Sequence, residues 1–514
     1  MTPMSETPPP RMNMAAYCLA EGARRTPDKA ALLVLRALTE GAAETWTYRE
    51  LQDAVLRVVG GLKVKGLRPG DRILIRLDNT SAYAILFFGA IAGGFVPIPA
   101  STELTEAEAG FMLSDSGAVA VALADQIECT DGPAGLLVLT AADVAALIQS
   151  GPQASYADTQ ANDAAFMVYT SGTTARPKGV LHAQRSAFGR RPMYQGWYGI
   201  GADDRVLHAG AFNWTFTLGT GLTDPWANGA TAIVFTGDKG PEVWPPLIRE
   251  TEATIFAAVP GVYRQILKYA PPGPLDLRSL RHGLTAGEAP ATNLFGDWQA
   301  RTGTPLYEAL GMSEISTYIS SSPSVPRKSG TTGKPQPGRR IAVLPVAEGN
   351  EPLPQGEQGL LAVHRSDPGL MLGYWNRPAE EADVMRGDWF CGGDLAVIDD
   401  HGYVTHLGRA NEIMKALGYR VSPLEVEVAL GVHPEIAEIA CAELNVREGV
   451  SVIAAFVVPR PGCEIDCEAI KAFAATRLAA YKCPREVVIV DALPRTSNGK
   501  VQRSRLAALS TPSK

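Results

Sequence analysis

Short β-rich runs alternate with helical segments along this chain of 514 residues. A helical pattern covers residues 48–64 and precedes a strand-like run at 72–77. Further runs of β-branched and small apolar residues follow at 119–123, 230–235 and 253–258. Strand, helix and strand at this rhythm are typical of largely parallel sheets covered by helices. The order of the segments therefore predicts an α/β fold.

The most apolar segment, residues 82–100, carries no charged side chain. Its length approaches that of a membrane-spanning helix. However, Gly93 and Gly94 are followed by Pro97 and Pro99, and these residues interrupt the second half of the segment. Because glycine and proline break helices, we predict a buried helix that runs into a buried strand, and no membrane span.

The amino-acid composition of the chain changes after residue 320. Proline and glycine crowd residues 323–338, and short strands with turns follow, as at 401–403, which predicts a β-rich subdomain. From about residue 408 the chain returns to a small α/β pattern, with residues 453–458 as a central strand. We therefore predict a multi-domain α/β (α+β) fold, with a large composite N-terminal body and a small C-terminal α/β unit.

Charge and cysteine content exclude several classes of partner. The chain has 47 basic and 54 acidic residues, a net charge of -7, so nothing calls for nucleic acid or an anionic membrane surface. Its seven cysteines are scattered and form no CxxC pair, which argues against zinc and against a disulfide framework. No basic cluster followed by an apolar core opens the chain, so we expect no signal peptide and a cytoplasmic protein.

A polar loop at residues 169–179 (YTSGTTARPKG) is the clearest local indication of a functional site. It follows the apolar run 164–168 and holds two glycines, four hydroxyls, a proline and a lysine. A strand that leads into such a loop can cradle phosphate, because backbone N–H groups converge there and the lysine adds charge. By composition alone an ordinary polar turn explains the loop equally well.

The same loop resembles the phosphate-binding signature of the ANL superfamily of adenylate-forming enzymes. Five further segments resemble the family's motifs in the family's order: LGMSE at 310–314, GKPQPG at 333–338, GDLA at 393–396, the stretch 408–427, and PRTSNGK at 494–500. The chain is therefore identified as a member of this superfamily, which includes acyl- and aryl-CoA synthetases. The resemblance implies a large body and a small mobile C-terminal lid.

The resemblance implies a reaction in two steps with ATP, Mg²⁺ and coenzyme A (CoA). A carboxylic acid and ATP first give an acyl-adenylate and pyrophosphate, and the CoA thiol then displaces AMP. The negative charge of the first step must be neutralised. The family's catalytic groups correspond to Lys500, to Glu314 as the Mg²⁺-linked carboxylate and to Ser313 at the α-phosphate. The implied ATP and AMP site consists of Thr170, Ser171, Gly172, Thr173, Thr174, Lys178, Gly287, Glu288, Ala289, Gly311, Ser313, Asp394, Arg409 and Lys500.

For the thiol step, the resemblance implies that a lid at residues 412–514 rotates against a body at 1–407. The hinge would lie at 408–411, with Asn411 at its centre. Glycine at 418 would leave room for a pantetheine arm. The implied CoA contacts are Gly418, Tyr419, Arg420 and Arg447.

The resemblance places the acyl pocket at Phe212, Asn213, Trp214, Thr217, Gly287 and Met312. Amino-acid-activating relatives carry an aspartate in this stretch to bind the substrate ammonium, whereas this chain has Asn213. An uncharged amide compensates a buried ammonium poorly, which disfavours amino acids. Three aromatic residues within five positions favour a ring or a compact apolar group. We therefore predict a benzoate-like or alicyclic acid, with a medium-chain fatty acid as the alternative.

Other functions remain open at this point. The chain could load an aryl acid on a separate carrier protein, or act as a luciferase-like oxygenase, although no feature favours the latter. An inactive acyl-nucleotide binding module would be expected to lack Lys500 or Glu314, and both are present. The resemblance to bacterial relatives also implies a lysine acyltransferase acting on Lys500, and a homodimer stays open. Three positions, Ala175, Leu310 and Gly392, depart from common family residues.

Overall fold

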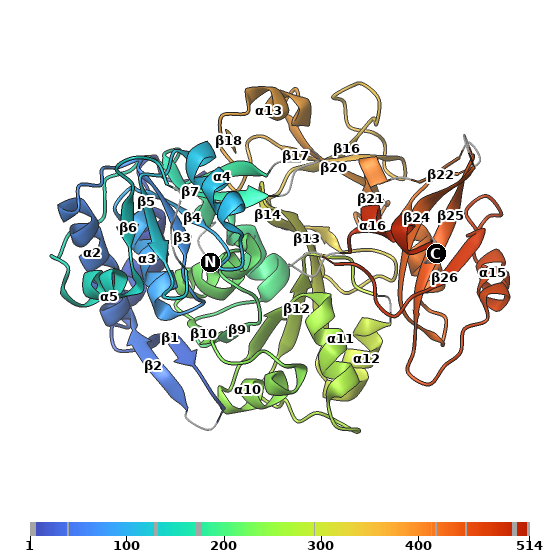
Figure 1. Ribbon diagram of the computed structural model, residues 1–514, viewed down its shortest axis with the longest axis horizontal. Helices are drawn as coiled ribbons and strands as arrows, with labels where there is room; N and C mark the ends of the chain where they lie inside the picture. The colour runs from blue at the N-terminus through green and yellow to red at the C-terminus, as the bar shows by residue number, and fades with distance from the viewer. Residues whose placement is uncertain are drawn as a thin grey trace.

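The computed structural model describes residues 7–38, 41–127, 132–170, 177–291, 293–412, 414–416, 419–447, 450–495 and 501–510. The chain forms a large body followed by a C-terminal unit, which lies at one end of the long axis (Figure 1). The predicted α/β class is confirmed, with parallel sheets and a β-rich subdomain in the body.

A nine-stranded sheet forms the centre of the body. Its six middle strands are parallel, and antiparallel strands close both edges. In spatial order the strands are β15 (Lys334–Pro335), β14 (Ser316–Ser320), β13 (Leu306–Met312), β12 (His282–Ala286), β11 (Ile255–Ala258), β9 (Arg205–His208), β10 (Thr231–Phe235), β1 (Ala30–Leu35) and β2 (Ala42–Thr47). The carboxyl ends of the parallel strands share one edge, which is where open parallel sheets bind ligands.

A second, four-stranded sheet is wholly parallel, in the order β4 (Val96–Pro99), β3 (Arg72–Arg76), β5 (Ala120–Leu123) and β6 (Leu137–Leu139). Helix α3 (Ser81–Ala92) packs against α2 (Tyr48–Val64) and leads into β4. Every residue at 83–99 is buried, and Gly94 makes the turn with a φ of 76°, which glycine adopts at little cost. The predicted buried helix and strand are confirmed.

The remaining helices of the body cover these sheets or join their strands (Figure 1). They include α1 (Met14–Arg25), α4 (Glu106–Ser116), α5 (Ala141–Ser150), α8 (Thr215–Leu218), α9 (Asp224–Ala227), α10 (Trp244–Glu250), α11 (Pro260–Tyr269) and α12 (Leu294–Thr302). Among the helices of the described ranges, none is long and apolar enough to cross a membrane.

Two antiparallel sheets complete the body. The first contains β18 (Gly373–Tyr374), β8 (Lys178–Ala183) and β7 (Ala164–Thr170), so the polar loop joins two paired strands. The second is the predicted β-rich subdomain, with β16 (Ile341–Leu344), β17 (Gln358–His364), β20 (Trp389–Ile398), β19 (Met385–Arg386) and β21 (Val404–Arg409). Helix α13 (Pro378–Val384) lies between β18 and β19 in sequence.

The C-terminal unit is a small α/β structure. Its main sheet has the order β24 (Ile436–Arg447), β25 (Val450–Pro459) and β26 (Glu486–Ile489), so the predicted central strand at 453–458 is confirmed within β25. A short hairpin of β22 (Met414–Ala416) and β23 (Tyr419–Val421) precedes it. The helices are α14 (Pro423–Leu430), α15 (Cys467–Ala475) and α16 (Arg503–Leu506).

The apolar cores of the two parts are separate. The C-terminal unit has two clusters of buried apolar residues, one around Val426, Ile453 and Ile470 and one around Phe456. Within the described ranges, no cluster joins residues before 408 to residues after 413. Apolar burial therefore stabilises each part on its own.

Candidate active site

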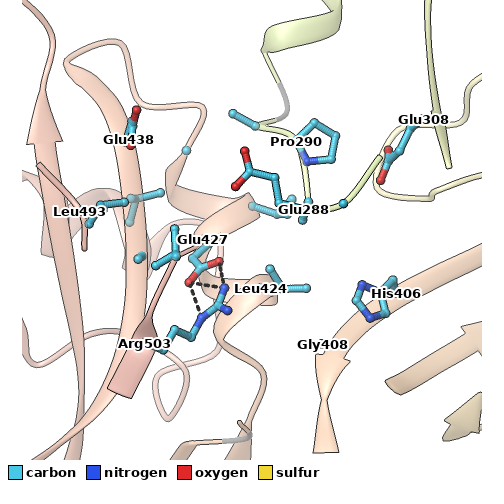
Figure 2. A pocket seen from close by; sticks show the side chains of 18 of the residues that line it. Glu288, Pro290, Glu308, His406, Gly408, Leu424, Glu427, Glu438, Leu493 and Arg503 are labelled. Atoms are coloured by element: carbon cyan, nitrogen blue, oxygen red, sulfur yellow. Dashed lines mark hydrogen bonds and ion pairs between the residues drawn. The ribbon is translucent and has the colours of Figure 1, made fainter. Parts of the chain in front are cut away.

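A pocket of about 280 Å³ lies between the body and the C-terminal unit (Figure 2). Its body wall contains the carboxyl ends of β12 and β13, and the end of β21 forms one side. The C-terminal unit closes it with α14, β24 and residues around Arg495. Six residues of the implied nucleotide site line this pocket: Gly287, Glu288, Ala289, Gly311, Asp394 and Arg409. The fold thus brings together motifs that are far apart in the sequence.

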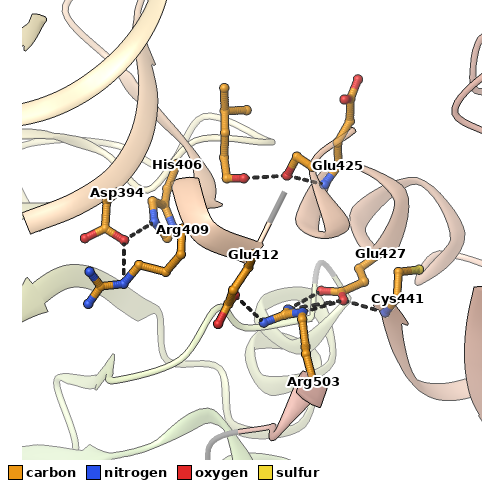
Figure 3. Close-up of polar contacts among 10 residues, drawn as sticks. Asp394, His406, Arg409, Glu412, Glu425, Glu427, Cys441 and Arg503 are labelled. Atoms are coloured by element: carbon orange, nitrogen blue, oxygen red, sulfur yellow. Dashed lines mark hydrogen bonds and ion pairs between the residues drawn. The ribbon is translucent and has the colours of Figure 1, made fainter. Parts of the chain in front are cut away.

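Asp394 is held at the pocket by two basic side chains (Figure 3). Its carboxylate Oδ1 lies 3.0 Å from His406 Nε2 and 3.4 Å from Arg409 Nε. Asp394 is buried, and its charge is the main cause that raises the pKa of Arg409 above its ordinary value. The aspartate is thus fixed as an acceptor, which suits the hydroxyls of a ribose. The motifs had not pointed to His406, although it lies two residues before Gly408.

The turn with Ser313 and Glu314 is fixed from two sides. His182 Nε2 lies 2.8 Å from the Ser313 carbonyl oxygen, and the Met371 N–H donates to the Glu314 carbonyl oxygen at 2.7 Å. The imidazole stacks on Phe166 at 4.6 Å, and burial lowers the pKa of His182 to about 4. It is therefore neutral, and because a carbonyl only accepts, Nε2 carries the hydrogen.

Tyr374 links Lys178, from the polar loop at 169–179, to Glu314. Its hydroxyl donates to Glu314 Oε1 at 2.7 Å, and the ammonium of Lys178 lies 3.6 Å from the centre of its ring. Lys178 also lies 3.8 Å from Glu380. Sequence reasoning missed Tyr374, since no motif contains it and only the pairing of β18 with β8 brings it to the site.

The aromatic residues of the implied acyl pocket meet the glycine motif. Gly287 has a φ of 98°, and a Cβ there would lie 2.5 Å from the Trp214 ring. Trp214 packs edge-on against Phe216 at 5.4 Å. Phe212 is buried 5.5 Å from the Tyr83 ring. Glycine at 287 therefore allows the indole to lie against the chain between β12 and the pocket.

The other implied acyl residues lie nearby with differing exposure. Asn213 is partly exposed just before α8, and Thr217 is buried within α8. Met312 fills the space beside Gly392, because a Cβ there would lie 2.5 Å from the Met312 sulfur. The departure from the family at Gly392 thus makes room for this methionine.

One carboxyl group that lines the pocket, that of Glu308, has a raised pKa. Burial raises the pKa of Glu308 to about 7, although Arg327 and His406 oppose the rise. Glu308 follows Tyr307 on β13 and faces the same cavity as His406 (Figure 2). Its place on the strand before the LGMSE motif was not singled out from the sequence.

Several implied site residues cannot be placed. Ser171, Gly172, Thr173, Thr174, Gly418 and Lys500 lie outside the described residues. Thr170 ends β7, Asn411 lies in the short segment Ala410–Glu412, Tyr419 and Arg420 begin β23, and Arg447 ends β24. Across the ranges that the structure describes, no group of three or more His, Cys, Asp or Glu could hold a metal ion.

Comparisons with known proteins agree with this geometry. Residues 19–375 match the family model described as AMP-binding enzyme, and residues 425–500 match the AMP-binding enzyme C-terminal domain. The chain is 33% identical to a benzoate–CoA ligase of Thauera aromatica over 90% of this chain and 91% of the relative. It is 30% identical to a 3-hydroxybenzoate–CoA ligase of Aromatoleum sp. over 91% and 92%. A solved anthranilate–CoA ligase in complex with anthranoyl-AMP superposes with a TM-score of 0.87, at 26% identity, over 98% of both chains.

Proposed function

This chain belongs to the family of AMP-binding enzymes, and on that premise we propose that it is an AMP-forming ligase that joins an aromatic carboxylic acid to CoA. In the first step a carboxylate oxygen attacks the α-phosphorus of ATP, and pyrophosphate leaves. In the second step the CoA sulfur attacks the acyl carbon, and AMP leaves. The observation that carries the proposal is the pocket in which Gly287, Asp394 and Arg409 meet.

Charge neutralisation is the main task of the first step. Lys500 supplies a positive charge to the carboxylate and the α-phosphate, while Arg409 is already held beside Asp394. Glu314 would hold Mg²⁺, which neutralises charge on the phosphates of ATP. One protein carboxylate suffices for this, because Mg²⁺ commonly completes its shell with substrate phosphates and water.

An aromatic acid suits the residues beside the nucleotide. Trp214 lies next to Gly287 and packs edge-on against Phe216. Aromatic rings pack edge-on or offset against such apolar surfaces. The benzoate and hydroxybenzoate substrates of the two relatives support the same class. A medium-chain fatty acid remains the alternative, since an indole also packs against aliphatic chains.

The thiol step needs a rearranged site. We propose that the C-terminal lid at 412–514 turns against the body at 1–407 about the hinge at 408–411, with Asn411 at its centre. The separate apolar cores of the two parts support this division. Gly418, Tyr419, Arg420 and Arg447 would then contact CoA.

The test is acid-dependent release of pyrophosphate with ATP and Mg²⁺. Benzoate, hydroxy- and aminobenzoates, cyclohexanecarboxylate and fatty acids of increasing length are each assayed with and without CoA. We expect sustained turnover with a ring acid only when CoA is present. One stoichiometric burst that ignores CoA would favour a carrier-protein acceptor, and turnover limited to fatty acids would refute the aromatic assignment.

A Trp214→Ala variant sharpens the assay. Loss of the indole should raise KM for the ring acid by about ten-fold, a value typical of one lost aromatic contact. KM for ATP should stay unchanged, since the indole faces the acyl side. Equal effects on both substrates would contradict the assignment of Trp214 to the acyl pocket.

Three further features are proposals on the same basis. A lysine acyltransferase acting on Lys500 would stop the first step, because acylation removes the charge of the lysine. We also propose a cytoplasmic location and a homodimer.

A further inference from the structure

Four charged side chains meet across the junction between the body and the C-terminal unit. Arg264 on α11 and Glu288 after β12 belong to the body, and Glu438 on β24 and Arg495 after β26 belong to the C-terminal unit. We call these four residues the charge quartet. Figure 2 shows Glu288 on the body and Glu438 on a strand of the C-terminal unit.

Arg495 makes the close bonds of the charge quartet. It donates from Nη1 to Glu288 Oε2 at 3.0 Å and from Nη2 to Glu438 Oε2 at 2.8 Å. Arg264 lies farther away, with 3.5 Å from Nη2 to Glu288 Oε1 and 3.7 Å from Nε to Glu438 Oε1. Burial raises the pKa of Glu438, but Arg264, Arg495 and Lys268 outweigh it and lower the pKa below its ordinary value. The carboxylate is therefore ionised and paired.

Arg495 also lies at the base of the segment that bears Lys500. Arg495 and Val501 form an antiparallel bridge, and the Gln502 N–H donates to the Pro494 carbonyl oxygen at 2.8 Å. The residue that follows Lys500 is therefore held opposite Arg495. On the far side, Arg503 binds Glu427 and Glu412 at 2.9 and 3.1 Å (Figure 3).

We propose that Arg495 is a positioning residue for acyl-adenylate formation, which it serves by tying the base of the Lys500 segment to Glu288 on the body wall of the pocket. The inference rests on the proposed function. It assigns to Arg495 no contact with substrate: the role rests on its bonds to the carboxylates of Glu288 and Glu438.

The composition of the charge quartet allows this tie to be released. Each part contributes one arginine and one glutamate, so each part keeps an ion pair of its own when the two separate. Glu438 would leave with Arg495. In the closed arrangement Glu288 Oε1 and Arg264 Nε lack hydrogen-bond partners, so these two residues can close on each other once Arg495 has gone. Separation then leaves no buried charge unpaired, which is the costly outcome.

The first experiment separates the two half-reactions in an Arg495→Gln variant. Loss of one charge-assisted bond predicts a fall of about ten-fold in single-turnover adenylate formation. The thioester step, started from supplied acyl-adenylate and CoA, should keep its rate. The matched control is Arg485→Gln, an exposed arginine of the same unit. An equal fall in both half-reactions, or none in either, would overturn the proposal.

Exchanging the charges of Arg264 and Glu438 should slow the thioester step instead of adenylate formation. The double variant Arg264→Glu with Glu438→Arg keeps two charges of each sign when the parts are together. It leaves two glutamates on the body and two arginines on the C-terminal unit when they separate. We therefore expect normal adenylate formation and a thioester step slower by about ten-fold, from the repulsion of like charges. A normal thioester step in this variant would contradict the release mechanism.

Amide hydrogen exchange tests the tie without any substrate. In the absence of ATP, Arg495→Gln should raise exchange in the segments 287–291 and 436–440, which face each other across the pocket, and Arg485→Gln should not. Unchanged exchange would refute the tie itself. Lack of acid-dependent pyrophosphate release by the unaltered protein would refute the proposed function instead, so the two failures are distinguishable.

Discussion

The inside of the body and its junction with the C-terminal unit hold charges in opposite ways. Inside the body, Arg190 pairs with Asp224 at 2.6 Å and Arg339 with Asp367 at 2.8 Å, and no side chain of the four is more than 9% exposed. At the junction, the side chains of Arg495 and Glu438 are 25% and 30% exposed. The two residues of a fully buried ion pair cannot separate without leaving an unpaired charge in the protein interior. At the junction, where the side chains are partly exposed, water can replace the lost partner.

Apolar contacts follow the same division. Phe88 and Trp226 meet at 4.7 Å inside the body, and both are completely or almost completely buried. The junction instead has a pocket and the charge quartet, while the clusters of apolar residues stay on either side. The difference teaches that apolar burial holds the body together, whereas charged side chains make the contacts described at the junction.

The largest expected effect is on the rate of adenylate formation, and it comes from a residue of the C-terminal unit. Lys500→Ala should slow adenylate formation roughly 10³-fold, because one positioned charge at the reacting phosphate is lost. The thioester step from supplied acyl-adenylate should survive. Single-turnover pyrophosphate release measures the first step, and Lys471→Ala on α15 is the matched control. Normal adenylate formation by Lys500→Ala would break the assignment.

Removing one partner of a fully buried ion pair should lower the free energy of unfolding more than any change at the junction. Asp224→Asn leaves the Arg190 guanidinium buried without its counter-charge, so we expect the free energy of unfolding of the body to fall by about 3 kcal/mol. All eight tryptophans lie at or before residue 389, so tryptophan fluorescence during urea unfolding reports on the body. Asp28→Asn, in an exposed pair with Arg49 at 3.0 Å, should change it by less than about 1 kcal/mol. Similar losses in both variants would contradict the contrast.

The body wall of the pocket should make stability depend on pH. Glu308 has a pKa of about 7 in the folded chain and an ordinary value near 4.5 when unfolded. As pH rises through this window the unfolded chain releases the proton first, so stability falls, and the loss is complete above pH 7. Glu308→Gln should therefore be more stable than the unaltered protein by about 3 kcal/mol at pH 8.

The pH profile itself is the control for Glu308. Urea unfolding at pH 5 and pH 8 should show a small difference between the two proteins at pH 5 and a large one at pH 8. A difference that does not vary with pH would mean that Glu308 titrates normally.

The smallest effect should come from the junction. Glu438→Gln removes one partly exposed carboxylate from the charge quartet, and the free energy of unfolding should change by less than about 1 kcal/mol. Far-UV circular dichroism follows both parts during urea unfolding. A loss comparable to that of Asp224→Asn would mean that the junction is sealed in the same way as the interior of the body.

Local patterns in the sequence were sufficient for most elements. The helix at 48–64, the buried segment at 82–100 and the central strand of the C-terminal unit follow from hydrophobic period and from glycine and proline positions. The motifs likewise pointed to Asp394, Arg409, Gly287 and Glu314. The elements could be predicted because they depend on neighbours along the chain, and the motifs could be assigned because they recur within a family.

The partners of those residues could not be predicted in the same way. His182 on Ser313 and Tyr374 on Glu314 join elements of different sheets, and His406 on Asp394 joins two paired strands of one sheet. Isolated histidines and tyrosines are too common to indicate such contacts. The charge quartet is a similar case, since Arg264 and Arg495 are 231 positions apart in the sequence. No period or spacing relates residues that only the packing of separate sheets brings together.

The sequence by itself determined the fold class, the family and the residue types of the reaction, because strand rhythm and motif order are written along the chain. Only the tertiary structure decided that Trp214 lies against Gly287, that Glu308 has its pKa raised, and that Arg495 bonds to Glu288 on the body. The physical reason is that burial and ion pairing depend on distances in space. Those distances are set when separate sheets and units pack against one another.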